Sequence, residues 1–188
     1  RTINALRFAD SGSTARTLTI GAASTAFNLA TYGILNGSTN PIGLTIANGA
    51  SNTGGLTTPT GGDNTLYLIA GTAAISVSAP IIDNGTAVNV VKSGNSTVTL
   101  GNDANTYTGV TTVNSGILTS NATITTFNAG ANGWLGNTTA AASNLVLNGG
   151  TLRYTGIALS TDRLFSVGSS GGALDASGTG AVNFSNAG

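Results

Sequence analysis

The residues that could do chemistry in this chain of 188 are few: six are basic, six are acidic, and His, Cys, Met, Glu and Gln are all missing. Without cysteine there is no disulfide scaffold, thiol nucleophile or Cys-based zinc site. Without histidine the commonest general base and metal ligand is lost. The stretch Gly168–Gly172 matches the nucleophile pattern G-x-S-x-G, but that elbow requires a histidine partner. We therefore expect no catalytic, cofactor-binding or metal-binding residue.

Acidic and amide side chains offer the next candidate chemistry, the binding of a hard cation. The stretch Gly61–Tyr67 resembles one calcium-binding nonapeptide of parallel β-rolls, with Asp63 as its acid, but such a site needs adjacent copies and the chain has one. A second set could supply oxygens if neighbouring turns stacked them. Asx turns are the favoured interpretation of this second set. Its members are Asp83, Asn84, Asn102, Asp103 and Asn105.

One charged group holds a third of all charge in the chain: Arg153, Asp162, Arg163 and Asp175. Polysaccharide lyases built on β-helices use such clusters, but an ion pair is the favoured interpretation here. The single tryptophan, Trp134, could stack on a sugar; partial burial at a corner is favoured over that role.

Two polar motifs recur along the chain. The N-x-S/T pattern begins at Asn36, Asn84, Asn95, Asn121, Asn137 and Asn183, and in a chain this rich in Asn, Ser and Thr most instances are attributed to chance. Thr-x-Thr pairs occur at 17/19, 97/99, 106/108 and 123/125. A flat ice-binding ladder would need these pairs at one constant spacing, and their offsets of 80, 9 and 17 do not fit.

Charge and hydropathy exclude two classes of partner. The formal net charge is zero and there is no basic run, so the electrostatic footprint of nucleic-acid binding is missing. No apolar run approaches the ~20 residues of a membrane helix.

The elements that must position these residues are short strands. Apolar and polar residues alternate in runs such as 17–20, 44–46, 75–77, 97–100 and 145–147, which predicts half-buried strands. Turn-forming Asn-Gly and Gly-Gly pairs separate the runs. The sequence is therefore predicted to be all-β, since its apolar content of 40% and its regular alternation argue against disorder.

An internal repeat favours stacked coils over a sandwich. Residues 98–110 align without a gap on 145–157, an offset of 47 that two rungs of roughly 23 residues would produce. Like-on-like stacking also suits a sequence with 6% charged residues, because equal charges directly opposite one another destabilise a sheet. We expect a β-solenoid of about eight rungs, or ~40 Å of rod.

A family resemblance sharpens this expectation. Lys92–Leu100 followed by Asn105–Leu118 resembles the autotransporter-associated β-strand repeat of bacterial passenger domains. The best match is at 92–118, and 145–157 resembles a second copy. The resemblance implies a right-handed parallel β-helix that is exported to the bacterial surface or the extracellular space. It brings no catalytic residue.

We therefore interpret residues 1–188 as a single β-helical segment, processed or excerpted from a longer chain. The expected function is that of an extracellular structural rod of an adhesin, surface fibre or filament. The alternative is a carbohydrate-active β-helix enzyme or a glycan-binding module. Expected partners are further coils or copies stacked end to end, or a glycan or protein of a host or surface.

Two physical expectations follow for this rod. The strand patterns predict a buried aliphatic core. Its members are Leu18, Ile20, Leu44, Ile46, Ile75, Val77, Val98, Leu100, Val113, Leu118, Leu145, Leu147, Leu152, Val182 and Phe184. Because neither His nor Cys is present, stability is expected to change little between pH 5 and 9.

Overall fold

A computed structural model describes residues 2–21, 26–121 and 123–188, and its strands form two long sheets and one short one. The first sheet contains β1 (Thr2–Phe8), β3 (Leu29–Asn36), β6 (Thr65–Ala70), β8 (Asn89–Ser93), β10 (Thr111–Val113), β12 (Leu145–Leu147) and β15 (Ser166–Val167), with β5 (Leu56–Thr57) paired to β3. The second contains β2 (Arg16–Ile20), β4 (Leu44–Asn48), β7 (Ile75–Val77), β9 (Thr97–Leu100), β11 (Ile117–Ser120), β13 (Thr151–Arg153) and β16 (Ala173–Asp175). The short sheet pairs β14 (Leu159–Thr161) with β17 (Val182–Phe184), and the 3-10 turn η1 spans Ala142–Asn144.

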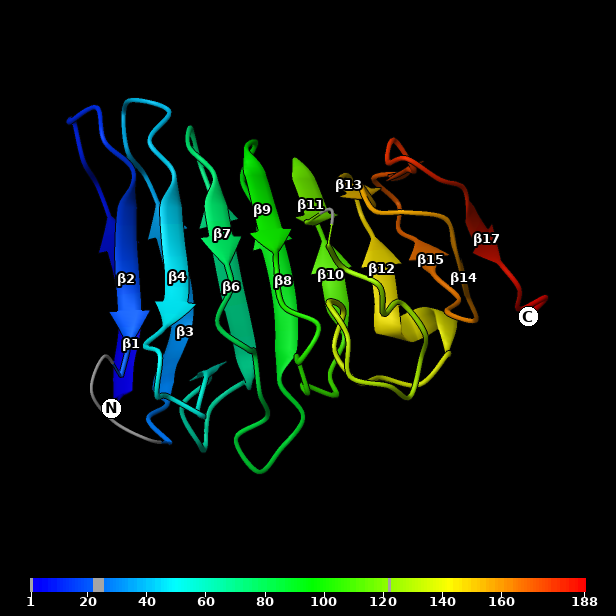
Figure 1. The fold of residues 1–188 in the computed structure, drawn as a ribbon, viewed down its shortest axis with the longest axis horizontal. Helices are drawn as coiled ribbons and strands as arrows, with labels where there is room; N and C mark the ends of the chain where they lie inside the picture. Colours follow the sequence, from blue (N-terminus) through cyan, green and yellow to red (C-terminus); the bar gives the residue numbers. More distant parts are fainter. Residues whose placement is uncertain (1, 22–25, 122) are drawn as a thin grey trace.

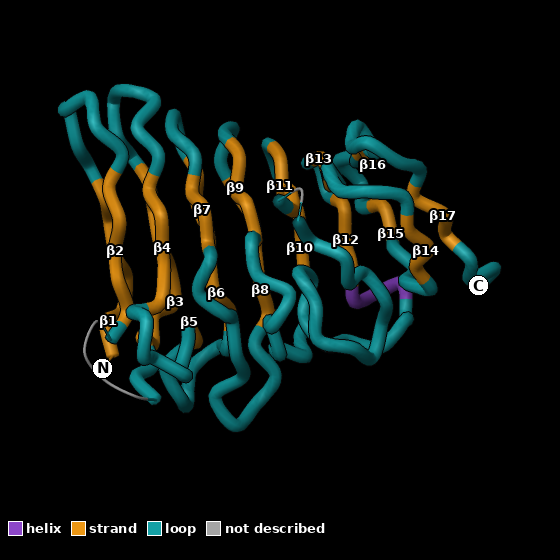
Figure 2. The backbone as a smooth tube through the Cα atoms, viewed as in Figure 1, coloured by secondary structure: helices purple, strands orange, loops and turns teal. Residues whose placement is uncertain are grey.

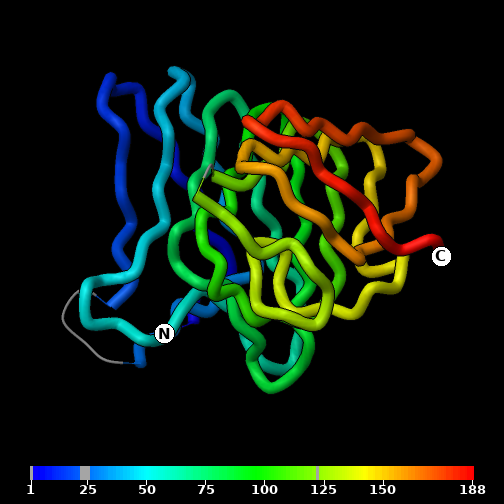
Figure 3. Tube along the Cα trace, turned by 45° about the vertical axis from the view of Figure 1, so that its right-hand side comes forward, coloured from blue at the N-terminus to red at the C-terminus, as the bar shows by residue number. Residues whose placement is uncertain are grey.

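Successive strands of each sheet come from successive passes of the chain, and they pair in parallel. The chain winds from one end of the molecule to the other (Figure 1), with loops projecting at the corners between strands (Figure 2). Seen from a second direction, the coils still follow one another in sequence order (Figure 3). The prediction of an all-β parallel β-helix is confirmed.

Within the described residues, each long sheet passes through seven strands, and the expected count of about eight rungs stays a prediction. The coils vary in length. Thr2 pairs with Ala30, a step of 28 residues, whereas Val90 pairs with Thr111, a step of 21. Thr111 then pairs with Leu145, a step of 34, because the insertion formed by residues 121–144 lies between β11 and β12.

The core lies between the two long sheets and consists of aliphatic columns. One column in the second sheet runs through Leu44, Ile75, Val98, Leu118 and Leu152, all buried. Of the predicted core residues, twelve are buried, and three are half-buried in the first and last coils: Leu18, Val182 and Phe184. These three are more exposed because only one side of an end coil is covered by another coil.

The offset of 47 residues does not correspond to two coils of this structure. Val98 belongs to β9 in the second sheet, whereas Leu145 belongs to β12 in the first. Two coils beyond Val98, the paired residue is Leu152. The similarity of 98–110 to 145–157 therefore reflects a shared strand-and-turn pattern on two different faces.

Because the coils differ in length, hydroxyl groups that are unevenly spaced along the sequence still come into register in the sheet. One outward column of the second sheet contains Thr17, Thr45, Ser76, Thr99 and Thr119 in consecutive coils. It ends at Arg153 and Asp175. The column therefore takes one residue from each of two predicted Thr-x-Thr pairs, while the pairs at 106/108 and 123/125 lie outside the strands.

Candidate functional site

The N-terminal coil leaves one end of the helical stack open. Among the described residues, its edge strands β1 and β2 pair on one side only, with β3 and β4. A hollow of about 340 Å³ lies at this end and is lined mainly by apolar side chains. They include Ile3, Leu18, Ile20, Phe27 and Leu29. Unpaired strand edges and uncovered apolar side chains together form a surface that can accept another coil.

The C-terminal coil leaves the opposite end open. Val167 is 55% exposed and Leu174 is 42% exposed, although the residues paired with them in the previous coil, Leu147 and Leu152, are buried. Behind this surface an aromatic cluster closes the core, with the rings of Phe127 and Trp134 5.3 Å apart and those of Phe165 and Phe184 5.6 Å apart. This end therefore also presents apolar side chains beside unpaired edges.

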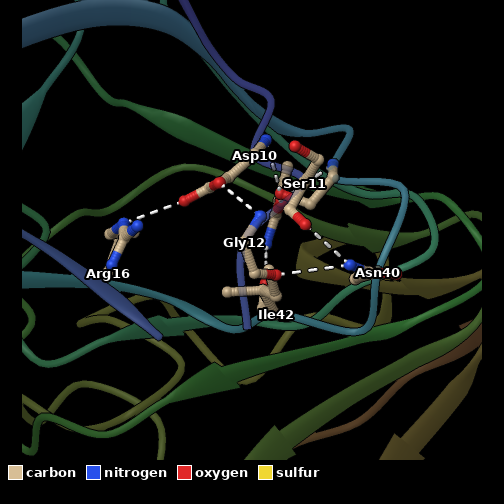
Figure 4. Close-up of polar contacts among 8 residues, drawn as sticks. Asp10, Ser11, Gly12, Arg16, Asn40 and Ile42 are labelled. Carbon is tan, nitrogen blue, oxygen red and sulfur yellow. Dashed lines mark hydrogen bonds and ion pairs between the residues drawn. The ribbon is translucent and has the colours of Figure 1, made fainter. Parts of the chain in front are cut away.

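Polar contacts fix the corner beside the N-terminal end (Figure 4). The Asp10 carboxylate accepts a hydrogen bond from the Gly12 N–H at 2.7 Å and pairs with the Arg16 Nε at 2.8 Å. These contacts hold the pKa of Asp10 below its usual value, with the Gly12 N–H as the largest cause. Asn40 in the next coil donates to the Ser11 carbonyl at 2.9 Å. The corner is thus tied to its neighbouring coil.

The predicted charged group does not assemble into one site. The Arg153 Nε and the Asp175 Oδ2 form an ion pair of 2.6 Å between adjacent coils, and this pairing lowers the pKa of Asp175. Asp162 instead accepts the Ala129 N–H at 2.8 Å. The ion-pair interpretation is confirmed for Arg153 and Asp175 and wrong for Arg163, which is only 3% exposed and makes no ion pair within the described ranges.

Arg163 instead secures the insertion 121–144 to the body of the solenoid. Its guanidinium donates to the carbonyls of Phe127 at 2.9 Å and Gly136 at 2.7 Å, and to the hydroxyl of Thr138. Burial lowers the pKa of Arg163, but an arginine remains charged at any ordinary pH. No sequence pattern marks this role, because the acceptors are mainly backbone carbonyls more than twenty residues away along the chain.

Most oxygens of the predicted cluster accept hydrogen bonds in turns or between coils, although the Asp103 Oδ1 is buried without a partner among the described residues. Asp83 caps the N–H groups of Val88 and Thr108. Asn102 donates to the Ser78 carbonyl, and Asn105 to the carbonyl of Trp134. Asp63 caps the N–H of Thr65. Within the described ranges, no three potential acidic or histidine ligands come together around a metal position. The Asx-turn interpretation is confirmed for Asn84 and Asn102, and Asp63 forms the same turn, since each side-chain oxygen accepts the N–H two residues further on, whereas most of the other contacts link neighbouring coils.

Trp134 is fully buried rather than partly buried, so it offers no platform for a sugar. Its ring packs beside Phe127 because the insertion folds inward over the aromatic cluster. Among the N-x-S/T positions, Asn36 is fully buried, whereas Asn95 and Asn183 are exposed.

Lys92 is a buried charged residue that was not among the predicted core or site residues. It lies in the inward column of the first sheet, between Leu68 and Val113, and is fully buried. Its ammonium donates to the carbonyls of Ser93 at 3.2 Å, of Gly94, and of Ser115 at 2.7 Å. Burial lowers its pKa to about 8. The alternation of inward and outward side chains that starts at Val90 predicts that Lys92 points inward. It does not predict which carbonyl groups accept its hydrogen bonds.

Lys92 sits in the stretch that comparison with known proteins identifies. Residues 90–119, which span β8 to β11, match the passenger-associated-transport-repeat family. The chain carries this autotransporter passenger repeat. The matched range includes the residues 92–118 on which the resemblance rested. A protein with this repeat is exported, and its place is the bacterial surface or the extracellular space.

A curated relative supports the same assignment. The chain is 43% identical over 97 residues to the adhesin BmaC autotransporter of Brucella suis biovar 1 (strain 1330). The aligned region is 51% of this chain and 3% of that much longer protein. No solved structure matches the passenger repeat chain. Over its described residues, the chain has no helix with the length and hydropathy of a membrane span.

Proposed function

We propose that this chain is a structural rod segment of a surface adhesin, which extends its coils end to end and displays side faces to a target. The observation that carries the proposal is the pair of open ends. Both end coils expose unpaired edges of the same two parallel sheets, and both expose apolar core residues. A further coil placed on either end would continue both ladders in the same parallel register.

That coil can come from a continuation of the solenoid into further coils or from a second copy of the chain. Contact between the C-terminal end of one copy and the N-terminal end of the next is heterologous and does not close, so it yields fibres rather than dimers. The adhesin BmaC relative supports a place in a surface adhesin. A carbohydrate-active enzyme is supported less well, because Arg153 and Asp175 neutralise one another and Arg163 is buried.

Sedimentation velocity and electron microscopy of the purified chain test the rod. We expect end-to-end oligomers that grow with concentration. Val167→Lys places a charge on the open C-terminal end and should abolish growth, whereas Thr99→Lys on a side face should leave it intact. A monodisperse wild-type monomer at high concentration would refute association. Incubation with neutral and uronate polysaccharides tests the enzyme alternative, since new reducing ends would support it.

A further inference from the structure

A polar groove of about 320 Å³ runs beside the start of the first sheet. Three of its lining residues, the floor of the groove, are neighbours in the first sheet, where Thr2 pairs with Ala30 and Ala30 pairs with Thr57 of β5. Its opposite wall contains Asp83 and Asn84 from the next coil. The groove adjoins the N-terminal end of the solenoid, since Thr2 of the edge strand β1 lines both the groove and the hollow at that end.

One floor residue has an unsatisfied polar atom. Thr57 is 4% exposed, and its hydroxyl is buried without a hydrogen-bond partner. Buried hydroxyl groups in folded proteins are paired in the great majority of cases, to protein or to ordered water. A polar molecule seated in the groove can supply the hydrogen bond that the Thr57 hydroxyl lacks among the described residues.

The wall opposite Thr57 is held rigidly. The Asp83 Oδ1 accepts the Val88 N–H at 2.8 Å and the Thr108 N–H at 3.1 Å, and its Oδ2 accepts the Thr108 hydroxyl at 2.7 Å. A carboxylate has about four acceptor positions, so one remains for a donor on a ligand. Asn84 is fixed by donating to the Thr58 carbonyl at 3.0 Å and the Pro59 carbonyl at 3.1 Å.

The lining chemistry selects among ligands. It offers threonine hydroxyls, which both donate and accept, and one carboxylate that only accepts. A saccharide matches this set because each of its hydroxyl groups can donate and accept in the same way. The lining residues include no base, so an acidic sugar would meet Asp83 without a compensating cation.

We infer that this groove binds a neutral saccharide unit, such as the terminal residue of a surface glycan. The inference rests on the proposed adhesin role and names the chemistry of its target. Thr57 and Asp83 supply the direct contacts, and Ala30 forms the floor against which the sugar ring lies.

Calorimetric titration and saturation-transfer NMR test the inference with defined probes: neutral oligosaccharides ending in glucose, galactose, mannose or N-acetylglucosamine, and sialyllactose as the acidic comparison. Thr57→Val keeps the side-chain shape and removes the unpaired hydroxyl, so the fold should be at least as stable while affinity for the neutral sugar falls about tenfold. Ala30→Leu should fill the floor and abolish binding. Thr99→Val, on the second sheet, is the matched control and should bind as wild type does.

The outcomes are separable from those of the rod proposal. Binding of one neutral probe, reduced by Thr57→Val and unaffected by Thr99→Val, supports the groove. Failure of every neutral probe, unchanged affinity in Thr57→Val, or equally strong binding of sialyllactose overturns it. None of these results changes the sedimentation of the chain, which tests the rod alone.

Discussion

The ammonium of Lys92 and the carbonyl oxygen of Ser115 lie 2.7 Å apart, in consecutive coils of the solenoid. The same ammonium also donates to the carbonyls of Ser93 and Gly94 in the turn of its own coil. A buried cation thereby bridges two stacked turns inside an aliphatic column. Lys92 and its three carbonyl partners all lie within residues 90–119, the range that matches the passenger repeat.

Lys92 makes stability depend on pH at the alkaline side. Its pKa is about 8 in the folded chain and 10.5 in the unfolded one. Between these values the unfolded state binds more protons, so stability rises as pH increases from 8 to 10.5, with a limiting slope of about 1.4 kcal/mol per pH unit. Below pH 8 both states are protonated and the contribution is constant. The free energy of unfolding is therefore expected to be constant from pH 5 to about 8 and to rise between pH 8 and 9, where a flat profile was predicted from the sequence.

Urea denaturation at a series of pH values from 6 to 10 checks this prediction. Lys92→Met keeps the length of the side chain and removes the titrating group, so its profile should be flat where that of the wild type rises. Equal profiles for the two proteins would show that Lys92 is not the source.

Tyr107 should reverse the trend at higher pH. Burial raises its pKa to about 12, and its hydroxyl contacts the Thr111 hydroxyl at 2.8 Å. The unfolded tyrosine loses its proton near pH 10, before the folded one, so stability falls above pH 10. Tyr107→Phe should weaken this alkaline loss. Absorbance of tyrosinate during titration measures it directly: because burial also raises the pKa of Tyr154, the wild type should show one more late-ionising tyrosine than the variant does.

Val98→Asp should unfold several coils together. Val98 is fully buried in the column between Ile75 and Leu118, so the substitution places an unpaired carboxylate in the core. We expect a loss of more than about 4 kcal/mol, seen as lost β-sheet circular dichroism at room temperature. Thr99→Asp changes the adjacent, outward-facing position and should retain the folded spectrum. A folded Val98→Asp protein would contradict the inward assignment of this residue.

Arg163→Met should loosen the insertion 121–144 while leaving the coils intact. The substitution leaves the Gly136 carbonyl without a donor and removes one of two donors from the Phe127 carbonyl, which keeps the Thr161 hydroxyl, at a cost of roughly 3 kcal/mol. Hydrogen exchange followed by mass spectrometry should show faster exchange over 126–138 and unchanged protection in β6 to β9. Arg153→Met, at the surface ion pair, should leave exchange in the insertion as it is in wild type. Uniformly faster exchange would mean that Arg163 supports the whole fold.

The sequence by itself determined the fold class and the repeat. Period-two alternation identified the inward residues of the second sheet, such as Val98 and Leu118, because a strand must turn every second side chain toward the core. The scarcity of charged residues indicated stacked coils, because equivalent positions of adjacent coils lie directly opposite one another and like charges there would repel. The motif at 92–118 identified the passenger repeat.

Only the tertiary structure decided which residues meet between coils. Coil length varies from step to step, so no constant offset could bring Thr17, Thr45 and Ser76 into one column. For the same reason the sequence could not show that Val98 shares a column with Leu152 and not with Leu145. The roles of Lys92 and Arg163 were likewise hidden, because their partners are backbone carbonyls, which every residue carries and no sequence pattern marks. The groove at Thr57 also depends on contacts across coils, since its floor and its wall are more than twenty residues apart along the chain.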